Sequence, residues 1–394
     1  MRICLIVDDY LPNSIKVAAK MMHELAVEFA SLGHDVMVVT PDYSIKNKYE
    51  ESILNGVKVY RFRSGEIKNV SKIKRAINES LLSYRAWNSL KEVFQKNPQD
   101  YIVYYSPSIF WGSLIGKIKN LWNVKTYLVL RDIFPQWALD NGLLKKHSII
   151  TKYFLFFEKK CYDSANTIGV MSKKNLDWFK EYYKGNAKVE LLFNWAEDSP
   201  VVLKSKPYRK KLGLEKKIVF FYGGNIGHAQ DMSQVIKLAK SMLNFPKVHF
   251  VLVGAGDEVG LVKNSIQEFH LKNMTLLPPV SQEDFKKLMA EFDVGFFCLH
   301  RNHTTHNFPG KILGYMVQGM PILGSVNFGN DLKEIVEEAK AGYVSVSGDE
   351  DQLLSNAKQF LKPGVVKTMS KNSKKLLEKQ FSVSSAANSI LHRF

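Results

Sequence analysis

Short apolar runs rich in β-branched residues alternate with helix-length amphipathic stretches along almost the whole chain. In the first half the runs are RICLIV, DVMVVT, VKVYRF, YIVYYS, KTYLVL and TIGVM, separated by helical patterns near residues 18–32, 70–95, 112–120 and 149–163. Strands that are apolar throughout are typical of parallel sheets with helices on both faces. The pattern therefore predicts an α/β fold built on doubly wound, Rossmann-like parallel sheets.

The alternation is interrupted once and then begins again. After the polar stretch VVLKSKPYRKKLGLEKK, residues 201–217, it resumes with IVFFYGG, VHFVLVG, MTLLPPV, VGFFCL and PILGS. A chain of 394 residues exceeds what one core usually supports. We expect one domain over residues 1–198, a second over 199–365, and a C-terminal helix within 366–394 that packs back on the first. Ligands of such folds bind at the carboxyl ends of the strands, so we expect a cleft between the domains.

The formal charge of +17 divides into about +8 for residues 1–199 and about +9 for the rest. It favours anionic partners such as phosphorylated small molecules or an acidic lipid surface. We expect no nucleic-acid partner, because no zinc-finger spacing, RNA-binding aromatic signature or heptad basic region is present. The widely separated Cys4, Cys161 and Cys298 indicate a reducing compartment and no metal site.

The N-terminus lacks a signal-peptide pattern, and no apolar run reaches the roughly 18 residues that span a bilayer. We therefore expect a cytoplasmic location and only peripheral contact with a membrane.

The stretch FFYGGNIGHAQD places three glycines, Gly223, Gly224 and Gly227, where a strand passes into a helix. Backbone N–H groups at such a turn can approach phosphate oxygens, and the helix end adds partial positive charge. A tight turn that binds nothing is the alternative. A second strand, VLVGAGDE, ends in glycine at Gly254, and Ser281 is the expected N-cap of a helix that follows.

The segment HNFPGKILGYMVQGMPIL, residues 306–323, places Lys311 between a Pro-Gly turn and an apolar helix. A lysine there is either solvated or faces an anion.

In the first domain, charged side chains follow two apolar strands. Arg131 and Asp132 come directly after YLVL, as either a structural ion pair or a substrate contact. Asp8 and Asp9 end the first strand, and the polar turn that follows holds Asn13, Ser14 and Lys16.

Two stretches of the first domain interleave basic and aromatic residues. One contains Lys72, Arg75 and Trp87, and the other is LLKKHSIITKYFLFFEKKCY, residues 143–162. Basic residues above an apolar face are typical of helices that lie on anionic membranes. An amphipathic helix packed on its own sheet would show the same pattern.

The chain resembles the glycogen-synthase-like and sucrose-synthase-like glycosyltransferases of the GT-B architecture, which has two Rossmann-like domains. The resemblance runs nearly end to end and is carried by ASLGHDVMVVT, YGGNIG, VGAGDE, PVSQEDFKKLMAEFDV and the segment around Lys311. The stretches NVSKIKRAINESLLSYRAWNSLK, VYYSPSIFWGSLIGKIK and YLVLRDIFPQWALDNGLL are similar to bacterial O-antigen and capsule enzymes, in particular the L-fucosamine (FucNAc) transferases.

The resemblance implies a glycosyltransferase that moves a sugar from a UDP-sugar to a glycan on a polyprenyl diphosphate, at the cytoplasmic leaflet of the inner membrane. UDP-sugar is then a substrate, and no cofactor or metal is expected. It assigns acceptor binding to Asn13, Ser14 and Lys16. It assigns donor binding to Gly223, Gly224, Asn225, Gly227, Gly254, Val280, Pro309, Lys311 and Gly314.

The sequence departs from this family at its hallmark E-x7-E motif. Counting from Pro309, His306 and Gly314 occupy the positions of the two glutamates, and Asn225 replaces the usual arginine of the glycine turn. Lys311 would then hold the diphosphate alone or with Arg131. The catalytic candidates are His306, Asp132, Asp9 and Arg131, where His306 could act as an acid or base.

Two other functions fit the same pattern. One is a nucleotide-sugar epimerase on the same architecture. The other is a non-catalytic protein that binds a nucleotide or a lipid surface, which the missing glutamates suggest.

Overall fold

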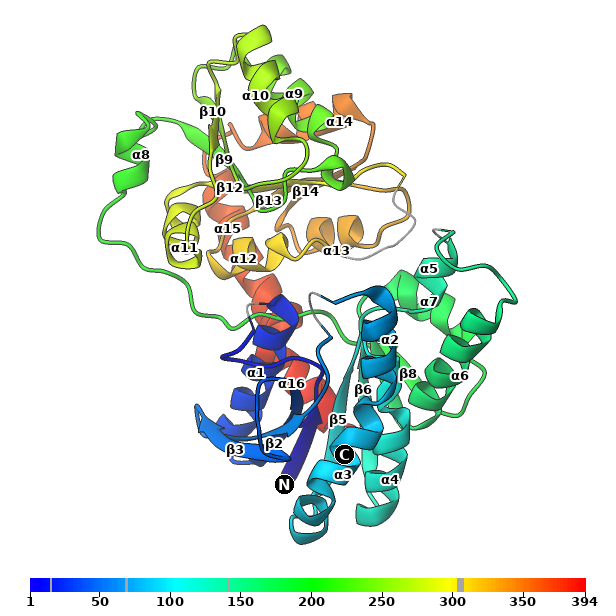
Figure 1. The fold of residues 1–394 in the computed structure, drawn as a ribbon. Helices are drawn as coiled ribbons and strands as arrows, with labels where there is room; N and C mark the ends of the chain where they lie inside the picture. Colours follow the sequence, from blue (N-terminus) through cyan, green and yellow to red (C-terminus); the bar gives the residue numbers. More distant parts are fainter. Residues whose placement is uncertain (15, 68–69, 141, 303–307) are drawn as a thin grey trace. The chain divides into compact units, whose positions relative to one another are not determined.

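The computed structural model describes residues 1–14, 16–67, 70–140, 142–302 and 308–394, and the chain forms two compact units. Unit 1 contains Met1–Phe193 and Val383–Phe394, and unit 2 contains Asn194–Ser382 (Figure 1). The predicted two-domain α/β fold is confirmed. The boundaries differ from those expected: unit 2 begins at Asn194, and residues 366–382 stay with it, so that only residues 383–394 return to unit 1.

Unit 1 is built on a sheet with the strand order β3-β4-β2-β1-β5-β6-β7-β8. Neighbouring strands pair in parallel except β3 and β4, which form an antiparallel hairpin. The strands are β1 (Arg2–Ile6), β2 (Asp35–Asp42), β3 (Tyr49–Leu54), β4 (Val57–Arg63), β5 (Tyr101–Ser106), β6 (Lys125–Leu130), β7 (Thr167–Val170) and β8 (Lys188–Leu191). Every residue of β5 is buried, as its continuous apolar sequence predicts.

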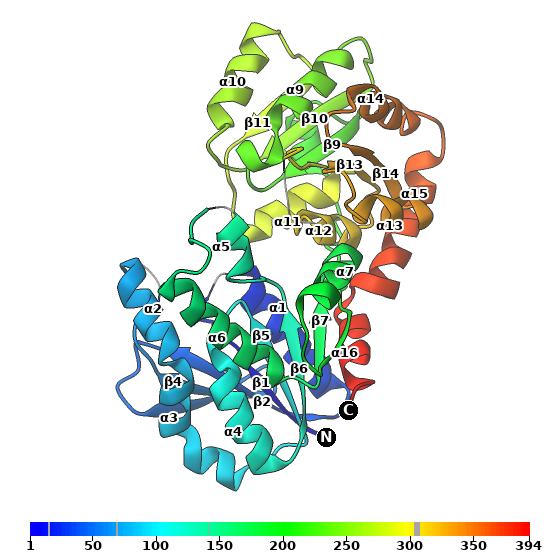
Figure 2. The same ribbon diagram turned by 90° about the vertical axis from the view of Figure 1, so that its right-hand side faces the viewer.

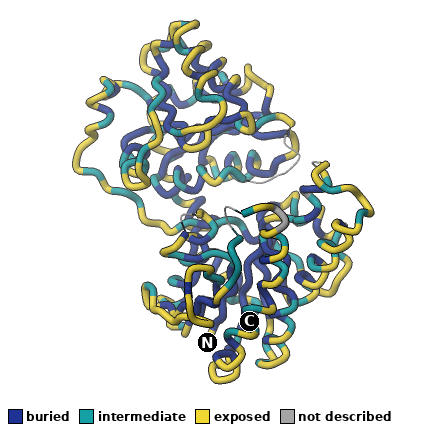
Figure 3. Tube along the Cα trace, viewed as in Figure 1, coloured by how far each residue is buried: buried dark blue, intermediate teal, exposed yellow. Residues whose placement is uncertain are grey.

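Helices cover both faces of this sheet (Figures 1 and 2). The helices α1 (Val17–Ser31) and α16 (Val383–Leu391) contact each other on one face, and α3 (Leu82–Lys96), α4 (Gly112–Trp122) and α6 (Ile149–Asp163) pack together on the other. The remaining elements are α2 (Lys72–Ser80), the 3-10 turn η1 (Ile109–Trp111), α5 (Gln136–Asp140) and α7 (Lys173–Tyr182). The tube in Figure 3 shows the central strands of the sheet as the buried layer.

Two local features differ from the sequence prediction. The helix expected over 70–95 is broken at Leu81 into α2 and α3, and Ser80 Oγ donates to the carbonyl of Ala76, which competes with the helical ladder. The second is the β3–β4 hairpin, which the pattern of apolar runs did not indicate because β3 is largely exposed. Its turn is Asn55-Gly56, with both residues at positive φ, a combination that favours tight hairpins.

Unit 2 is a parallel sheet with the order β11-β10-β9-β12-β13-β14. The strands are β9 (Ile218–Gly223), β10 (Val248–Val253), β11 (Met274–Leu277), β12 (Val294–Cys298), β13 (Ile322–Val326) and β14 (Gly342–Val346). The helices α9 (Met232–Ser241), α10 (Val259–Glu268) and α14 (Glu350–Gln359) lie over one face, and α11 (Gln282–Glu291), α12 (Lys311–Val317) and α13 (Leu332–Glu338) over the other (Figures 1 and 2). A 3-10 turn, η2 (His228–Gln230), precedes α9, and Ser281 caps α11 as expected.

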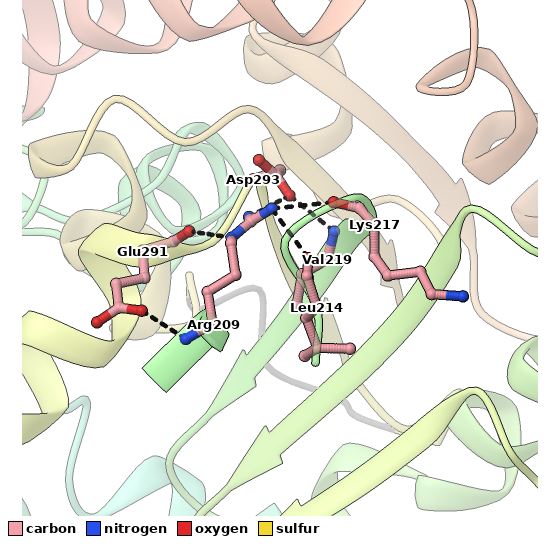
Figure 4. Close-up of polar contacts among 6 residues, drawn as sticks. All are labelled: Arg209, Leu214, Lys217, Val219, Glu291 and Asp293. Carbon is pink, nitrogen blue, oxygen red and sulfur yellow. Dashed lines mark hydrogen bonds and ion pairs between the residues drawn. The ribbon is translucent and has the colours of Figure 1, made fainter. Parts of the chain in front are cut away.

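A buried polar cluster fastens the short helix α8 (Pro207–Lys211) to unit 2 (Figure 4). The Arg209 guanidinium donates to the carboxylate of Asp293 at 2.6 Å and to the carbonyl of Glu291 at 3.0 Å. The Glu291 carboxylate accepts from the N–H of Arg209 at 2.7 Å, and Asp293 also accepts from the N–H of Val219 in β9. The polar stretch that separates the two apolar series is therefore held to the sheet by this ion pair and its backbone hydrogen bonds, together with the burial of Leu214.

The chain ends in α15 (Val365–Leu376), the π-helical turn η3 (Leu377–Phe381) and α16. Both α15 and η3 contact α12, whereas α16 contacts α1. The predicted packing of the C-terminal helix on the first domain is thus confirmed for α16, and α15 belongs to the core of unit 2.

Candidate functional site

In unit 2, β9 ends in the predicted glycine turn. Gly224 has φ +107°, a conformation that side chains rarely allow, and its N–H donates to the carbonyl of Val253 at 2.9 Å. The turn is thereby held against the end of β10. Tyr222, the last aromatic residue of β9, donates its hydroxyl to the carbonyl of Asn225 at 2.9 Å and fixes the other side of the turn.

The second glycine turn, after β10, packs directly on the first. A Cβ on Gly254 would lie 1.8 Å from the carbonyl oxygen of Gly224, and one on Gly256 would lie 2.1 Å from that of Ile226. The N–H of Ile226 donates to the carbonyl of Ala255 at 2.9 Å. Glycine at 254 and 256 is therefore required by close approach of two backbones, and both turns form one rigid shelf.

Lys311, the first residue of α12, extends over this shelf. Its Nζ lies 3.7 Å from the centroid of the Tyr222 ring, and its Cε would be 3.9 Å from a Cβ on Gly224. Within the described residues the Nζ is buried and has no hydrogen-bond partner. Burial lowers the pKa of this amine to about 7, and the neighbouring Cys298 opposes the shift.

Burying an amine without a hydrogen-bond partner costs free energy, and an anion bound beside it would remove this cost. Lys311 has an aromatic face beneath it and glycine backbone beside it, so an incoming phosphate oxygen would meet a cation and few obstructing side chains. The structure thus brings together Lys311 and the Gly223–Gly227 turn, the two features that the sequence singled out separately. The geometry favours an anion-binding role over a solvated lysine.

The other predicted donor residues have varied surroundings. Asn225 donates its amide to Gln230 at 2.5 Å, and a Cβ on Gly227 would lie 2.4 Å from Asp257. Val280 packs against the cluster of buried apolar residues on this face of the sheet, and the Pro309 carbonyl accepts from the N–H of Ile312. A Cβ on Gly314 would lie 3.3 Å from the methyl group of Met289. His306 lies outside the described residues.

Further basic groups near the shelf were not predicted. The rings of His228 and His300 lie 4.8 Å apart, and the N–H of His300 donates to the carbonyl of Ala229 in η2. Arg301 follows, with its guanidinium carbon 3.2 Å from where a Cβ on Gly348 would lie. Sequence reasoning had only a weak signal for them, because η2 and the segment after β12 are distant in the chain.

In unit 1, Arg131 and Asp132 follow β6 as predicted, but they face different surroundings. Arg131 is buried and donates to the carbonyls of Leu130, Gly169 and Phe193 at 2.9, 3.3 and 3.2 Å. It therefore ties together the ends of the neighbouring strands, which is a structural role. Asp132 is exposed.

The polar turn after β1 is an interconnected cluster. Asp9 accepts a hydrogen bond from Ser14 at 2.7 Å and lies 3.5 Å from the Nζ of Lys16, and Asn13 donates to Asp42 at 3.0 Å. Asp8, Asp9 and Asn13 line a small cavity of about 60 Å³. Burial raises the pKa of Asp8 to about 6, and the charge of Lys16 partly offsets this shift.

A basic and aromatic face is formed where α6 meets α2, joined by a hydrogen bond of 2.6 Å from the Tyr153 hydroxyl to Ser80. We call it the α2–α6 face. Its exposed apolar side chains are Ile77, Leu81, Tyr84, Ile149, Ile150, Tyr153 and Phe156. Lys145, Lys146 and Lys152 are exposed nearby, and Arg75 pairs with Glu79 at 2.9 Å.

The prediction that Trp87 faces a membrane is wrong. Its ring stacks on Phe94 at 6.2 Å, packs against the core of unit 1, and lies under the ammonium of Lys117 at 5.1 Å. The break at Leu81 separates α3 from the exposed face of α2, so that α3 follows the alternative of packing on its own sheet. The side chain of Lys72 is not among those described.

Across the described chain, no helix is long and apolar enough to cross a membrane. In the same residues, no group of three or more His, Cys, Asp or Glu side chains is placed to hold a metal ion. Metal independence stays a prediction.

Comparison with known proteins finds glycosyltransferases. Residues 18–198 match the family described as Glycosyltransferase Family 4, and residues 204–376 match Glycosyl transferases group 1. WbjE of Pseudomonas aeruginosa, named as a glycosyltransferase, is 25% identical over 56% of this chain and 55% of its own length. WcaI of Escherichia coli strain K12, named as a colanic acid biosynthesis glycosyl transferase, is 23% identical over 76% of this chain and 77% of its own.

The fold is also that of a solved structure. Anabaena Alr3699/HepE in complex with UDP superimposes with a TM-score of 0.67 and 14% identity, covering 100% of this chain and 99% of that one. The two consecutive Rossmann-like units and the family match in each of them together define the class of the protein. Both matches are to families of glycosyltransferases, and the chain is an enzyme of that kind.

Proposed function

We propose that the protein transfers a sugar from a UDP-sugar to a glycan carried on a polyprenyl diphosphate, in the biosynthesis of O-antigen or capsule polysaccharide. The observation that carries the proposal is the buried, unpartnered Nζ of Lys311 above the glycine shelf. The UDP present in the similar Anabaena structure supports a UDP donor. The chain spans about half the length of WbjE, so the acceptor and pathway belong to the proposal.

Breaking the bond between the sugar and the diphosphate places negative charge on the leaving oxygen. A cation and oriented N–H groups stabilise that charge most effectively when they are already in place and sheltered from water. Lys311 would supply the cation. In the turn Gly223–Gly227 the N–H groups of Gly223, Gly224 and Ile226 donate within unit 2, so those of Asn225 and Gly227 are the ones that would donate to the diphosphate. Binding of the diphosphate would return Lys311 to its charged form.

For the donor sugar we propose an N-acetylated amino sugar such as L-FucNAc. The support is the sequence resemblance of residues 69–91, 103–119 and 127–144 to FucNAc transferases. WbjE is named as a glycosyltransferase and WcaI as a glycosyl transferase of colanic acid biosynthesis, which supports sugar transfer in a biosynthetic pathway of this kind.

The lipid-linked acceptor would bring the protein to the cytoplasmic surface of the inner membrane. The α2–α6 face supports this, because Ile149 and Phe156 are 87% and 61% exposed on one side of α6, with basic residues around them. Apolar side chains enter the interface while each lysine near anionic lipid contributes about 1 kcal/mol.

The transfer proposal is tested with a panel of UDP-sugars and a synthetic GlcNAc-diphosphate-lipid acceptor, followed by mass spectrometry of the lipid. We expect one sugar to be added from UDP-FucNAc and little from the other donors. A free epimer formed without acceptor would instead indicate an epimerase. UDP binding without transfer to any acceptor would indicate a non-catalytic binding protein.

The membrane proposal is tested by flotation with anionic vesicles. The double variant Ile149→Glu and Phe156→Glu should release the protein, because it places charge where apolar side chains enter the lipid. Val202→Glu is the matched control, since Val202 is 89% exposed outside this face. Equal binding of both variants would show that the α2–α6 face does not contact the membrane.

A further inference from the structure

Unit 2 contains a second cavity, of about 980 Å³, that shares no lining residue with the glycine shelf. It is formed by α13, β14, α14 and the start of α15, which lie together at the β14 end of the sheet (Figure 2). Its polar lining residues are Lys333, Glu337, Lys340, Tyr343, Ser345, Asp349, Gln352, Ser355, Asn356, Gln359, Thr368 and Asn372.

The edge strand β14 cannot pair with a further strand, because its outward backbone groups already have hydrogen-bond partners. The N–H of Val344 donates to the carboxylate of Glu337 at 3.2 Å, and its carbonyl accepts from Lys333 at 2.9 Å. Further along, the carbonyl of Val346 accepts from the N–H of Asp349 at 3.0 Å. Strand addition needs these backbone groups free. The cavity is therefore not a groove for an extended peptide, and its remaining hydrogen-bonding capacity lies in side chains.

One of those side chains is incompletely satisfied. Asn356 is 5% exposed and accepts a hydrogen bond from Gln352 at 2.7 Å, but its Nδ2 has no partner within the described residues. A buried donor left unpaired costs about 1–3 kcal/mol. A ligand oxygen at the wall of the cavity would satisfy this amide.

The charges of the lining balance, although the whole chain carries +17. Lys333 and Glu337 pair at 2.7 Å, and Lys340 and Asp349 add one charge of each sign. An anionic ligand such as a nucleotide finds no net attraction there. The uncharged polar lining consists of amides, hydroxyls and the partly buried Tyr343, and apolar side chains such as Val346, Val365 and Met369 lie among them. Polar groups interspersed with apolar surface suit hydroxyl-rich, uncharged molecules, whose rings present both.

We propose that this cavity is a second carbohydrate site, which holds an uncharged pyranose oligosaccharide apart from the nucleotide shelf. Sugar hydroxyls would accept from Asn356 and exchange hydrogen bonds with Gln359, Thr368 and the other uncharged side chains of the lining. The site does not depend on sugar transfer, so its occupation can be measured without turnover.

The test is saturation-transfer NMR of the full chain with chitotriose, maltotriose and mannotriose. We expect at least one of them to receive saturation from the protein. Asn356→Leu should weaken that binding by about tenfold, equivalent to one buried hydrogen bond. Ser355→Trp should abolish the binding, because the indole would fill the cavity. Since Ser355 is more exposed than Asn356, this variant still tests the proposal if Asn356→Leu fails to fold.

Gln267→Leu is the matched control, because it removes an exposed amide on α10, outside the cavity lining. UDP affinity of each variant is measured in parallel and should not change, which separates this site from the proposed donor site. The proposal is overturned if none of the three sugars receives saturation. It is equally overturned if binding persists undiminished in both cavity variants, since the sugar would then lie elsewhere.

Discussion

At the scale of single residues, Lys311 has a buried amine without a hydrogen-bond partner among the described residues. Replacement by Met keeps the length of the side chain and removes the amine. We expect UDP binding to weaken by about 1.5–3 kcal/mol, because one charge-assisted contact is lost. Without UDP, the melting temperature should rise, because an unpaired buried amine is removed. Isothermal titration and thermal denaturation measure the two effects, and unchanged UDP affinity would mean that Lys311 does not touch the diphosphate.

The same residue predicts how UDP binding depends on pH. In the free protein the pKa of Lys311 is lowered to about 7 by burial, so the amine is charged below that pH and neutral above it. A diphosphate favours the charged form and raises this pKa in the complex. UDP affinity should therefore fall as pH rises above about 7, and Lys311→Met should lose this dependence. Calorimetric titrations with UDP at several pH values measure this dependence, and Lys311→Arg is the control whose side chain stays charged throughout.

At the scale of structural elements, the two glycine turns of unit 2 behave as one piece. Gly254→Ala would place a methyl group 1.8 Å from the carbonyl oxygen of Gly224, at a φ of +158°. The first turn must then move, and with it the N–H groups offered to the diphosphate. We expect UDP binding to fall by at least about tenfold. Gly260→Ala is the control, because a Cβ there meets nothing within 4 Å. Equal UDP affinity in the two variants would contradict the rigid shelf.

The anchoring of α8 gives a second prediction for an element. Arg209→Leu leaves the carboxylate of Asp293 without its buried partner, and breaking such a pair costs about 3–5 kcal/mol. Urea unfolding of unit 2 should shift by that amount. Lys237→Leu is the matched control, since its pair with Glu350 is exposed and should contribute less than about 1 kcal/mol. Similar losses in both variants would show that the α8 cluster is not tightly coupled to the fold.

The sequence predicted the positions of helices and strands better than it predicted which of their side chains are exposed. The helical pattern near 149–163 matches the bounds of α6, and the predicted cap Ser281 stands directly before α11, because apolar periodicity and a capping side chain are local signals. The exposed β3 was missed, although Asn55-Gly56 carried the signal of its turn. Trp87 was assigned to the wrong environment, because the phase of a helix is lost when an unrecognised break, here at Leu81, intervenes.

Within the site, spacing located Lys311 and the glycine turn but not what lies between them. That Tyr222 lies beneath the amine depends on strand order, since β9 pairs with β12 across long stretches of chain. Likewise, Asp8 and Asp9 are indistinguishable in sequence. Only the fold shows that Asp9 has hydrogen-bonded partners whereas burial raises the pKa of Asp8.

At the scale of the whole molecule, the division into two units separates the functions proposed for them. The shelf and Lys311 belong to unit 2, whereas the α2–α6 face and the Asp8–Asp9 cavity belong to unit 1. Each unit has its own apolar core, so each can unfold as a cooperative body. A ligand that binds one unit stabilises that unit directly.

Calorimetry of the full chain tests this division. UDP at about a hundred times its dissociation constant should stabilise unit 2 by about 2.7 kcal/mol and raise only one of two unfolding transitions. Ile390→Ala in α16, whose side chain is buried in unit 1, should lower the other transition by about 2–5 kcal/mol and leave the UDP-sensitive one in place. Ile53→Ala, at a 72% exposed position of unit 1, is the control. If UDP raises the transition that Ile390→Ala lowers, the nucleotide does not act through unit 2 alone, because the site and the C-terminal helix would then share one cooperative body.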